Sequence, residues 1–227
     1  MDKIIYCIGG GELGKRETYE IDKHLVEMTG KKRPHALFIP TASHDAVDYI
    51  DCFLTLYEEL GCEVLSLNLY DEPTAKEVDD LLEWADFVYV GGGETSLLVD
   101  KWIESGFDKK IKKAYSKGLI LAGLSAGSSC WFQRYLGLRM GDLKPYWADG
   151  LGLIKGATTP HYDENDRKRF DTDLKGERMV GTAIDNGVAL IYNNGKLVGN
   201  WKAYGWKANA YQLNFDKKGI LHKKVIA

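Results

Sequence analysis

Cysteine, long apolar runs and an excess of either charge are all scarce in this chain. It has four cysteines in 227 residues, and no two of them stand at C-x-x-C spacing, so neither a zinc site nor a disulfide framework is indicated. Buried free thiols are the expectation. No run approaches the roughly 20 apolar residues that cross a bilayer, and the run at residues 4–8 is too short for a signal peptide. These absences predict a soluble, cytoplasmic protein without a membrane partner.

The balance of charge excludes a further class of partner. Lys and Arg number 30 against 33 Asp and Glu, a formal net charge of −3, which predicts no extended basic surface for nucleic acid. A small molecule or a short peptide is therefore the expected partner. Linkers rich in Gly and Ser are also lacking, and a hydrophobic content of 44% supports a substantial core. One domain over residues 1–227 is the simplest organisation.

Short aliphatic runs alternate with longer amphipathic stretches over the first half of the chain. Runs such as IIYCIG, HALFIP, EVLSLNL, FVYVGG and LILAGLS have little polar alternation, which is typical of strands in a parallel sheet covered on both faces. Strand followed by helix, repeated, predicts a doubly wound α/β sheet. The expected helices lie near residues 16–29, 45–60, 75–84, 95–105 and 107–117.

The last third of the chain has a different pattern. Residues 188–215 contain an Asn-Gly dipeptide between apolar runs, which is the strongest short-range signal for a β-hairpin. Antiparallel strands are therefore expected here, at the edge of the sheet.

The stretch GLSAGSSCWF, residues 123–132, follows directly on the strand-like run LILA. Its serine, Ser125, stands at G-x-S-x-G spacing, which is the pattern of a nucleophile elbow: a strand, a strained turn that carries the serine, and a helix. Such an elbow would put the N–H of Ala126 at the start of the helix, where it can stabilise an oxyanion. The alternative is a turn of small residues that only lets the strand and the helix pack closely.

Two copies of the tetrapeptide GGGE occupy Gly9–Glu12 and Gly91–Glu94. The second copy follows a strand, so its backbone N–H groups are expected at the carboxyl end of the sheet, where open α/β sheets bind ligands. They can complete an oxyanion hole or hold a phosphate, although neither copy matches a phosphate-binding motif. The alternative for both copies is a tight turn without a ligand, and for the first copy this alternative is favoured.

Of the five histidines, His161 is the best placed to act as a base. It follows Pro160, which favours extended backbone before it, and it precedes a charged segment with helical character. The other four fall in an amphipathic stretch, at a strand start, in a polar turn and near the C-terminus. If Ser125 uses an imidazole base, His161 is the candidate; the alternative is an ordinary polar residue.

Three motifs together, a Y-V-G-G-G strand end, G-L-S-A-G-S-S-C-W-F and P-H-Y-D-E, resemble the peptidase E family of serine hydrolases, peptidase family S51. The family includes aspartyl dipeptidases and is related to cyanophycinases. The resemblance implies a three-layer α/β/α sandwich of the class I glutamine amidotransferase-like kind, with a mostly parallel sheet and an antiparallel edge hairpin. Serine in place of the amidotransferase cysteine disfavours glutamine amidotransfer.

The resemblance also implies roles for single residues. Ser125 matches the nucleophile, His161 the base, and Gly92 and Ala126 the oxyanion donors. The implied reaction is hydrolysis of short peptides through an acyl-enzyme. Dipeptides, with N-terminal aspartate among them, are the expected substrates, and neither a metal nor an organic cofactor is required.

The third member of the triad is less clear. In the family the acid sits late in the chain, and the matching position is Asn186, next to Asp185. Adjacent strand residues face opposite ways, so only one of this pair can orient His161. Two earlier acids, Asp142 and Asp149, are the alternatives.

Further residues are expected near the substrate. Glu94 stands where the family commonly has asparagine, which would put a carboxylate beside the oxyanion site. Arg167 and Arg169 can bind the side-chain carboxylate of an aspartyl substrate, and the alternative for their segment is a solvated helix face. Aromatic residues can close a small pocket, or belong to the core or to a homodimer contact; these are Trp131, Tyr146 and Trp147.

Two rival functions follow from the same residues. The chain can be a binding or regulatory protein that kept the fold and lost its triad, because Asn186 and Glu94 are what a decayed site would contain. It can also be an esterase or amidase that uses Ser125 and His161 on a different acyl group. Labelling by a fluorophosphonate, which requires an activated serine, distinguishes a peptidase from a binding protein with a decayed site. Substrate profiling distinguishes a peptidase from an esterase or amidase.

Overall fold

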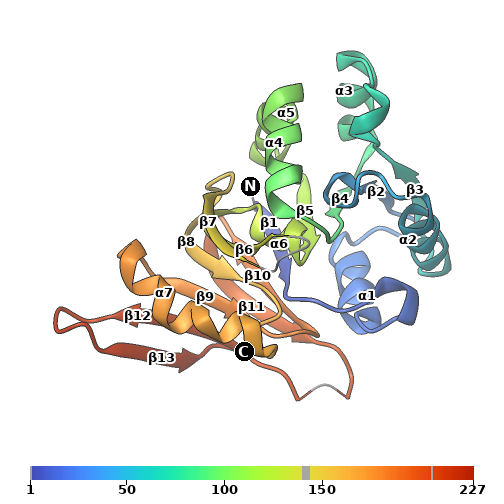
Figure 1. Ribbon diagram of the computed structural model, residues 1–227. Helices are drawn as coiled ribbons and strands as arrows, with labels where there is room; N and C mark the ends of the chain where they lie inside the picture. The colour runs from blue at the N-terminus through green and yellow to red at the C-terminus, as the bar shows by residue number, and fades with distance from the viewer. Residues whose placement is uncertain (1, 140–143, 206) are drawn as a thin grey trace.

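The computed structural model describes residues 2–139, 144–205 and 207–227. Within these residues the chain forms one sheet of seven strands and one of six, with helices on both faces of the first (Figure 1). The α/β sandwich expected from the sequence is confirmed.

The first sheet is the predicted parallel one. Its strands follow the order β11-β10-β1-β5-β4-β2-β3, and the five from β1 to β3 in that order pair in parallel. The residues of β1, β2, β4 and β5 are almost all buried because helices cover both faces, whereas β3 at the sheet edge is partly exposed. The bounds are β1 (Ile4–Ile8), β2 (His35–Ile39), β3 (Glu63–Ser66), β4 (Phe87–Val90), β5 (Ile120–Leu124), β10 (Val188–Asn193) and β11 (Lys196–Lys202).

Alternate residues of each central strand face two different helical layers. In β1, Tyr6 and Ile8 pack into the core beneath α1 and α2, whereas Ile5 and Cys7 pack into the core beneath α3, α4 and α5. The helices lie close to the predicted positions: α1 (Tyr19–Met28), α2 (Val47–Glu59), α3 (Ala75–Trp84), α4 (Thr95–Ser105) and α5 (Phe107–Ser116), with short 3₁₀ helices η1 (Leu13–Lys15), η2 (Thr41–Ser43) and η3 (Leu69–Asp71).

The edge hairpin is also confirmed. Strands β10 and β11 pair antiparallel and turn through Asn194 and Gly195. Both residues have positive φ, 51° and 72°, which is the conformation that an Asn-Gly hairpin turn requires.

The second sheet was not predicted from the sequence. It has the strand order β13-β12-β9-β8-β6-β7 and lies beside the first sheet, with helix α7 against it (Figure 1). Strand β12, expected from the sequence at the edge of the first sheet, pairs here instead with β9 and β13. The bounds are β6 (Phe132–Leu138), β7 (Pro145–Asp149), β8 (Ile154–Thr159), β9 (Gly181–Ile184), β12 (Ala210–Phe215), β13 (Leu221–Val225), η4 (Asn165–Arg169) and α7 (Phe170–Glu177).

The helices of the described ranges are short. The helix α2 has 13 residues, and across residues 2–139, 144–205 and 207–227 no helix combines the length and the apolar character needed to cross a membrane.

The junction of β5 with the short helix α6 (Ala126–Ser129) depends on two glycines. A Cβ on Gly123 would lie 2.0 Å from the carbonyl oxygen of Gly127, and a Cβ on Gly127 would lie 2.2 Å from that of Val90. Backbone from three segments therefore meets here at a distance that no side chain allows.

We predict that Gly123→Ala lowers the melting temperature, because the β5–α6 junction must open to admit the methyl group. The expected cost is roughly 1–3 kcal/mol of unfolding free energy, measured by thermal unfolding. Gly176→Ala is the matched control: it lies in α7 and its Cβ would meet nothing within 4 Å, so it is expected to leave the melting temperature unchanged or slightly raised. Equal melting temperatures for Gly123→Ala and the unmodified chain would contradict the packing argument.

Candidate active site

Ser125 stands at the β5–α6 junction in a strained conformation. Its φ of 54° and ψ of −107° lie outside the common regions for a residue with a side chain. The strain is maintained by hydrogen bonds on both sides: Ser125 N donates to Ile8 O at 2.9 Å, and Ser125 O accepts from the N–H groups of Ser128 and Ser129 at 3.0 and 2.9 Å. This is the geometry predicted for a nucleophile elbow.

The order of the central strands explains which segments surround this serine. β5 lies between β1 and β4, so the glycines that follow β1 and β4 lie on either side of Ser125 at the carboxyl ends of the strands. The two GGGE motifs therefore flank one serine, although they are more than 80 residues apart in the chain.

His161 approaches Ser125 from the loop that follows β8. Its Nε2 lies 2.7 Å from Ser125 Oγ, and its backbone N–H donates to Gly9 O at 3.0 Å. The residue has a φ of 53°, a second left-handed conformation at a residue with a bulky side chain. The two residues singled out in the sequence are thus in direct hydrogen-bond contact.

Asn186 lies on the other side of the imidazole, in the turn between β9 and β10. Its Oδ1 is 2.7 Å from His161 Nδ1, and its Nδ2 donates to the carboxylates of Asp163, at 3.1 and 3.2 Å, and Glu164, at 3.2 Å. Because ionised carboxylates only accept hydrogen bonds, the amide nitrogen faces them and the amide oxygen faces His161. His161 Nδ1 must then carry the proton, which leaves the lone pair of Nε2 directed at the Ser125 hydroxyl.

Burial lowers the pKa of His161, and the positive charge of Arg167 acts in the same direction. The carboxylates of Glu164 and Asp163 and the hydrogen bond that His161 donates to Asn186 oppose this shift. The imidazole is therefore neutral at neutral pH, which is the state that a base requires.

Gly10 belongs to the site, although the sequence favoured a plain turn for the first GGGE copy. A Cβ on Gly10 would lie 1.9 Å from Asn186 Oδ1 and 2.4 Å from His161 Nδ1. Gly10 O also accepts a hydrogen bond from Gly187 N at 3.0 Å, beside Asn186. The glycine thus leaves room for the His161–Asn186 hydrogen bond, and the repetition of GGGE was the only signal of this in the sequence.

The region expected to bind an oxyanion differs from the prediction in one contact. The N–H of Gly92, predicted as a donor, donates to the hydroxyl of Tyr49 at 3.0 Å. A Cβ on Gly92 would lie 3.5 Å from Ser125 Cβ and 3.8 Å from Tyr49 Oη, so all three groups share one corner of the site. The N–H of Ala126, at the start of α6, has no hydrogen-bond partner within the described ranges.

The family model of peptidase family S51 matches residues 5–198. This chain belongs to peptidase family S51. The uncharacterized peptidase YgaJ of Bacillus subtilis is 34% identical over 200 residues, which are 87% of this chain and 86% of YgaJ. Peptidase E of Streptomyces coelicolor is 26% identical over 166 residues, 72% of this chain and 65% of that protein. The fold matches the crystal structure of a peptidase from an acI-B1 actinobacterium, with a TM-score of 0.68 at 23% identity, over 99% of this chain and 98% of that one.

The chain is therefore an S51 peptidase, and the structure separates the candidates for the third triad position. Asn186, not Asp185, contacts the imidazole. Asp185 makes a different contact: its Oδ2 accepts a hydrogen bond from Asn209 N at 2.8 Å. Asp149 pairs with Arg134 across the β6–β7 ladder at 2.8 Å. Both acids are corrections to the prediction, and Asp142 lies outside the described residues.

The residues expected to face the substrate of this S51 peptidase take three different positions. Glu94 accepts a hydrogen bond from Ser96 Oγ at 2.8 Å, at the start of α4. Arg169 forms an ion pair with Asp173 one helical turn away, at 2.6 Å, so it takes the solvated-face alternative. Arg167 is half-buried, and burial lowers its pKa. Its Nε is buried without a hydrogen-bond partner in the part of the chain that the structure describes.

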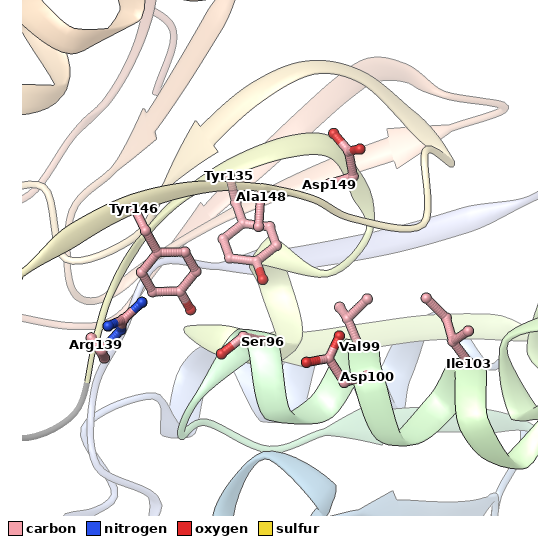
Figure 2. Close-up of a pocket in the computed structure, with 9 residues that line it drawn as sticks. All are labelled: Ser96, Val99, Asp100, Ile103, Tyr135, Arg139, Tyr146, Ala148 and Asp149. Carbon is pink, nitrogen blue, oxygen red and sulfur yellow. The ribbon is translucent and has the colours of Figure 1, made fainter.

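A cleft of about 420 Å³ opens between α4 and the β6–β7 ladder. Figure 2 shows the hydroxyl groups of Tyr135 and Tyr146 directed across it toward Ser96 and Asp100 on α4. Tyr146 therefore lines a cavity, as the sequence allowed. The other two aromatic candidates pack elsewhere: Trp131 is fully buried against Trp102, and Trp147 lies on Phe170.

The cysteines are free, as predicted: Cys7, Cys62 and Cys130 are buried and Cys52 is half-buried. Among residues 2–139, 144–205 and 207–227, no group of three or more His, Cys, Asp or Glu side chains converges in a way that could hold a metal ion.

We predict that Gly10→Ala reduces the reaction of Ser125 with a fluorophosphonate by about 100-fold, because the methyl group must displace His161 or Asn186 and a shift of about 1 Å has this effect on catalytic geometry. The measurement is the second-order rate of labelling, with circular dichroism to verify folding. Gly14→Ala is the control, since its Cβ would meet only Cys52 Sγ at an ordinary 3.5 Å. Labelling of Gly10→Ala at the rate of the unmodified chain would contradict the assignment.

Proposed function

We propose that this S51 peptidase hydrolyses short peptides, dipeptides with N-terminal aspartate among them, through an acyl-enzyme on Ser125. The observation that carries the proposal is the 2.7 Å contact between Ser125 Oγ, on a strained turn, and His161 Nε2. The strain holds the hydroxyl at the carboxyl edge of the sheet, and the hydrogen-bond chain through Asn186 orients the imidazole. This combination is the arrangement of an activated serine.

In the first step, Ser125 loses its hydroxyl proton and a tetrahedral intermediate forms on its oxygen. Ser125 Oγ attacks the peptide carbonyl carbon while His161 Nε2 takes the hydroxyl proton. The carbonyl π-electrons move to the oxygen, which becomes an oxyanion. His161 becomes an imidazolium whose Nδ1–H remains bonded to Asn186 Oδ1.

The oxyanion is held by two donors, the N–H of Ala126 and the O–H of Tyr49. The Tyr49 hydroxyl already accepts a hydrogen bond from Gly92 N, so its own proton is left for a substrate oxygen. Burial raises the pKa of Tyr49 to about 12, which keeps this proton in place at neutral pH. Gly92 thus has a supporting part: its N–H orients the tyrosine beside Ser125.

Collapse of the tetrahedral intermediate releases the amine. The imidazolium gives its Nε2 proton to the leaving nitrogen as the C–N bond breaks, and the acyl group remains as an ester on Ser125. Water then enters, loses a proton to His161 Nε2 and attacks the ester carbonyl. The Ser125 oxygen leaves with that proton, and a carboxylic acid and free serine result.

The substrate class rests on Arg167 and on the cleft lined by Tyr146, which is near enough to Arg167 to act on its pKa. Arg167 is near enough to His161 to act on its pKa, and a half-buried guanidinium is suited to a carboxylate such as the aspartyl side chain. The cleft between α4 and the β6–β7 ladder (Figure 2) would take another part of the peptide. Short peptides remain the proposed partner, without nucleic acid or membrane, and a homodimer stays a prediction.

The rival functions are judged by the same contacts. A binding protein that had lost its triad would have no need to keep Ser125, His161 and Asn186 within hydrogen-bond distance, so the intact contacts support catalysis. An esterase or amidase would use the same groups, and only its acyl substrate would differ.

We predict that a panel of X-Leu dipeptides, including α- and β-linked aspartyl peptides, is cleaved at aspartyl members by the unmodified chain and not by Ser125→Ala. Removal of the nucleophile eliminates the covalent route. Release of free leucine is the measurement. Ser128→Ala is the control, because it removes a serine hydroxyl from the same short helix and leaves Ser125 and its flanking glycines unchanged. If folded protein that still labels at Ser125 cleaves no dipeptide of the panel, the dipeptide proposal is wrong and the enzyme acts on a different acyl group.

We also predict that Tyr49→Phe lowers kcat on the order of tenfold to hundredfold with little change in KM, because an oxyanion donor acts chiefly in the transition state. The substitution also frees the N–H of Gly92. If Gly92 were itself the donor, kcat would therefore stay constant or rise, and this result would contradict the role given to Tyr49.

A further inference from the structure

The imidazole of His161 faces an amide at the position where the family resemblance implies a carboxylate. Asn186 can orient the ring, but it carries no charge to stabilise the imidazolium that forms when Ser125 attacks. The structure provides negative charge next to this amide. Behind the amide stand the carboxylates of Asp163 and Glu164.

We propose that Asp163 and Glu164 are positioning residues that supply the negative charge that the third triad position lacks, Asp163 through Asn186 and Glu164 both through Asn186 and beside His161 Nδ1. This proposal rests on the proposed function of Ser125 and His161. Asp163 accepts from both the backbone N–H and the Nδ2 of Asn186, at 2.8 and 3.1 Å. Glu164 Oε1 lies 3.2 Å from Asn186 Nδ2 and 3.4 Å from His161 Nδ1.

The two carboxylates come from the same turn as the base. Glu164 N donates to His161 O at 2.9 Å, which closes the turn. Tyr162, the residue after His161, is fully buried, and its N–H donates to Ile184 O at 3.0 Å. A buried tyrosine and a strained histidine thus fix the loop, so the short H-Y-D-E segment carries both a base and its counter-charge.

The charges around His161 act in opposite directions. Asp163 and Glu164 favour the imidazolium, whereas Arg167 on the following turn and burial of the ring disfavour it. Asn186, from the β9–β10 turn, is neutral, and Ser125 and Gly10 complete the surroundings. Because Asp163 and Glu164 are exposed to solvent, screening reduces their effect. The expected contribution to the rate is on the order of tenfold.

The chemistry of the relay follows from the direction of its hydrogen bonds. The carboxylates accept from the amide nitrogen, which increases the negative charge on Asn186 Oδ1. That oxygen accepts from His161 Nδ1–H, and this bond strengthens when the ring gains a proton at Nε2. No proton moves beyond His161; the two carboxylates stabilise charge and hold the amide in one orientation.

The experiment is the pH dependence of Ser125 labelling by a fluorophosphonate in the double variant Asp163→Asn/Glu164→Gln. Each substitution removes the negative charge, keeps one oxygen that can accept from Asn186, and replaces the other oxygen by an NH2 donor. Labelling requires neutral His161, so its rate rises with pH through the His161 pKa. Loss of two nearby negative charges should move this midpoint to lower pH and reduce the plateau on the order of tenfold. A residue that only maintained the loop would change the plateau and not the midpoint.

A charge exchange provides the second readout. Asn186→Asp, added to the double variant, puts one carboxylate directly on His161 Nδ1, with amide groups behind it as donors. The triple variant should recover the plateau and raise the midpoint above that of the double variant. Asp173→Asn is the control, because this carboxylate on α7 pairs with Arg169 and makes no contact with His161 or Asn186 in the described structure.

The outcomes separate this proposal from the one it rests on. An unmodified chain that fails to label at Ser125 would overturn the proposed function. An unmodified chain that labels, together with a double variant of equal plateau and midpoint, would overturn only the role of Asp163 and Glu164. Failure of the charge exchange in a folded triple variant would overturn it as well.

Discussion

The site depends on one constraint, the close approach of backbone segments at the carboxyl ends of β1, β5 and β4. A Cβ on Gly123 or Gly127 would collide with the backbone, and one on Gly10 with the His161–Asn186 pair. Because these three positions lack side chains, Ser125 can take a φ of 54° and still reach His161. The strain is offset by the packing of a sheet that is buried on both faces. The geometry of the Ser125–His161 contact thus depends on three glycine positions that must lack a side chain.

Charge around the imidazole is distributed in an unusual way. His161 contacts an amide, and the nearest carboxylates contact that amide in turn. This arrangement determines the tautomer without ambiguity, since carboxylates accept, an amide nitrogen donates and an amide oxygen accepts. The site therefore keeps the directional part of a triad at Asn186 and carries its negative charge at Asp163 and Glu164.

The features of the fold and the site that short sequence patterns encode could be predicted. Aliphatic runs and the Asn-Gly turn predicted the first sheet and its hairpin, and the elbow motif predicted Ser125 with His161 as its partner. The second sheet was not predicted, because pairings such as β9 with β12 and β6 with β8 join strands that are not neighbours in the chain. Tyr49 and Gly10 were missed for the same reason: each acts through contacts with distant segments, such as the bond from Gly92 to Tyr49. Strand alternation predicted that only one of Asp185 and Asn186 could face His161, but both residues lie in the turn after β9, so the choice required the conformation of that turn.

The most direct test of the account is the location of the adduct after reaction with a fluorophosphonate, determined by mass spectrometry of the digested protein. The account predicts one phosphonyl group per chain, on Ser125, and loss of the adduct in His161→Ala although that variant keeps the serine and the elbow. A folded chain that acquires no adduct, or acquires it equally in His161→Ala, would contradict the claim that these two residues form an activated pair.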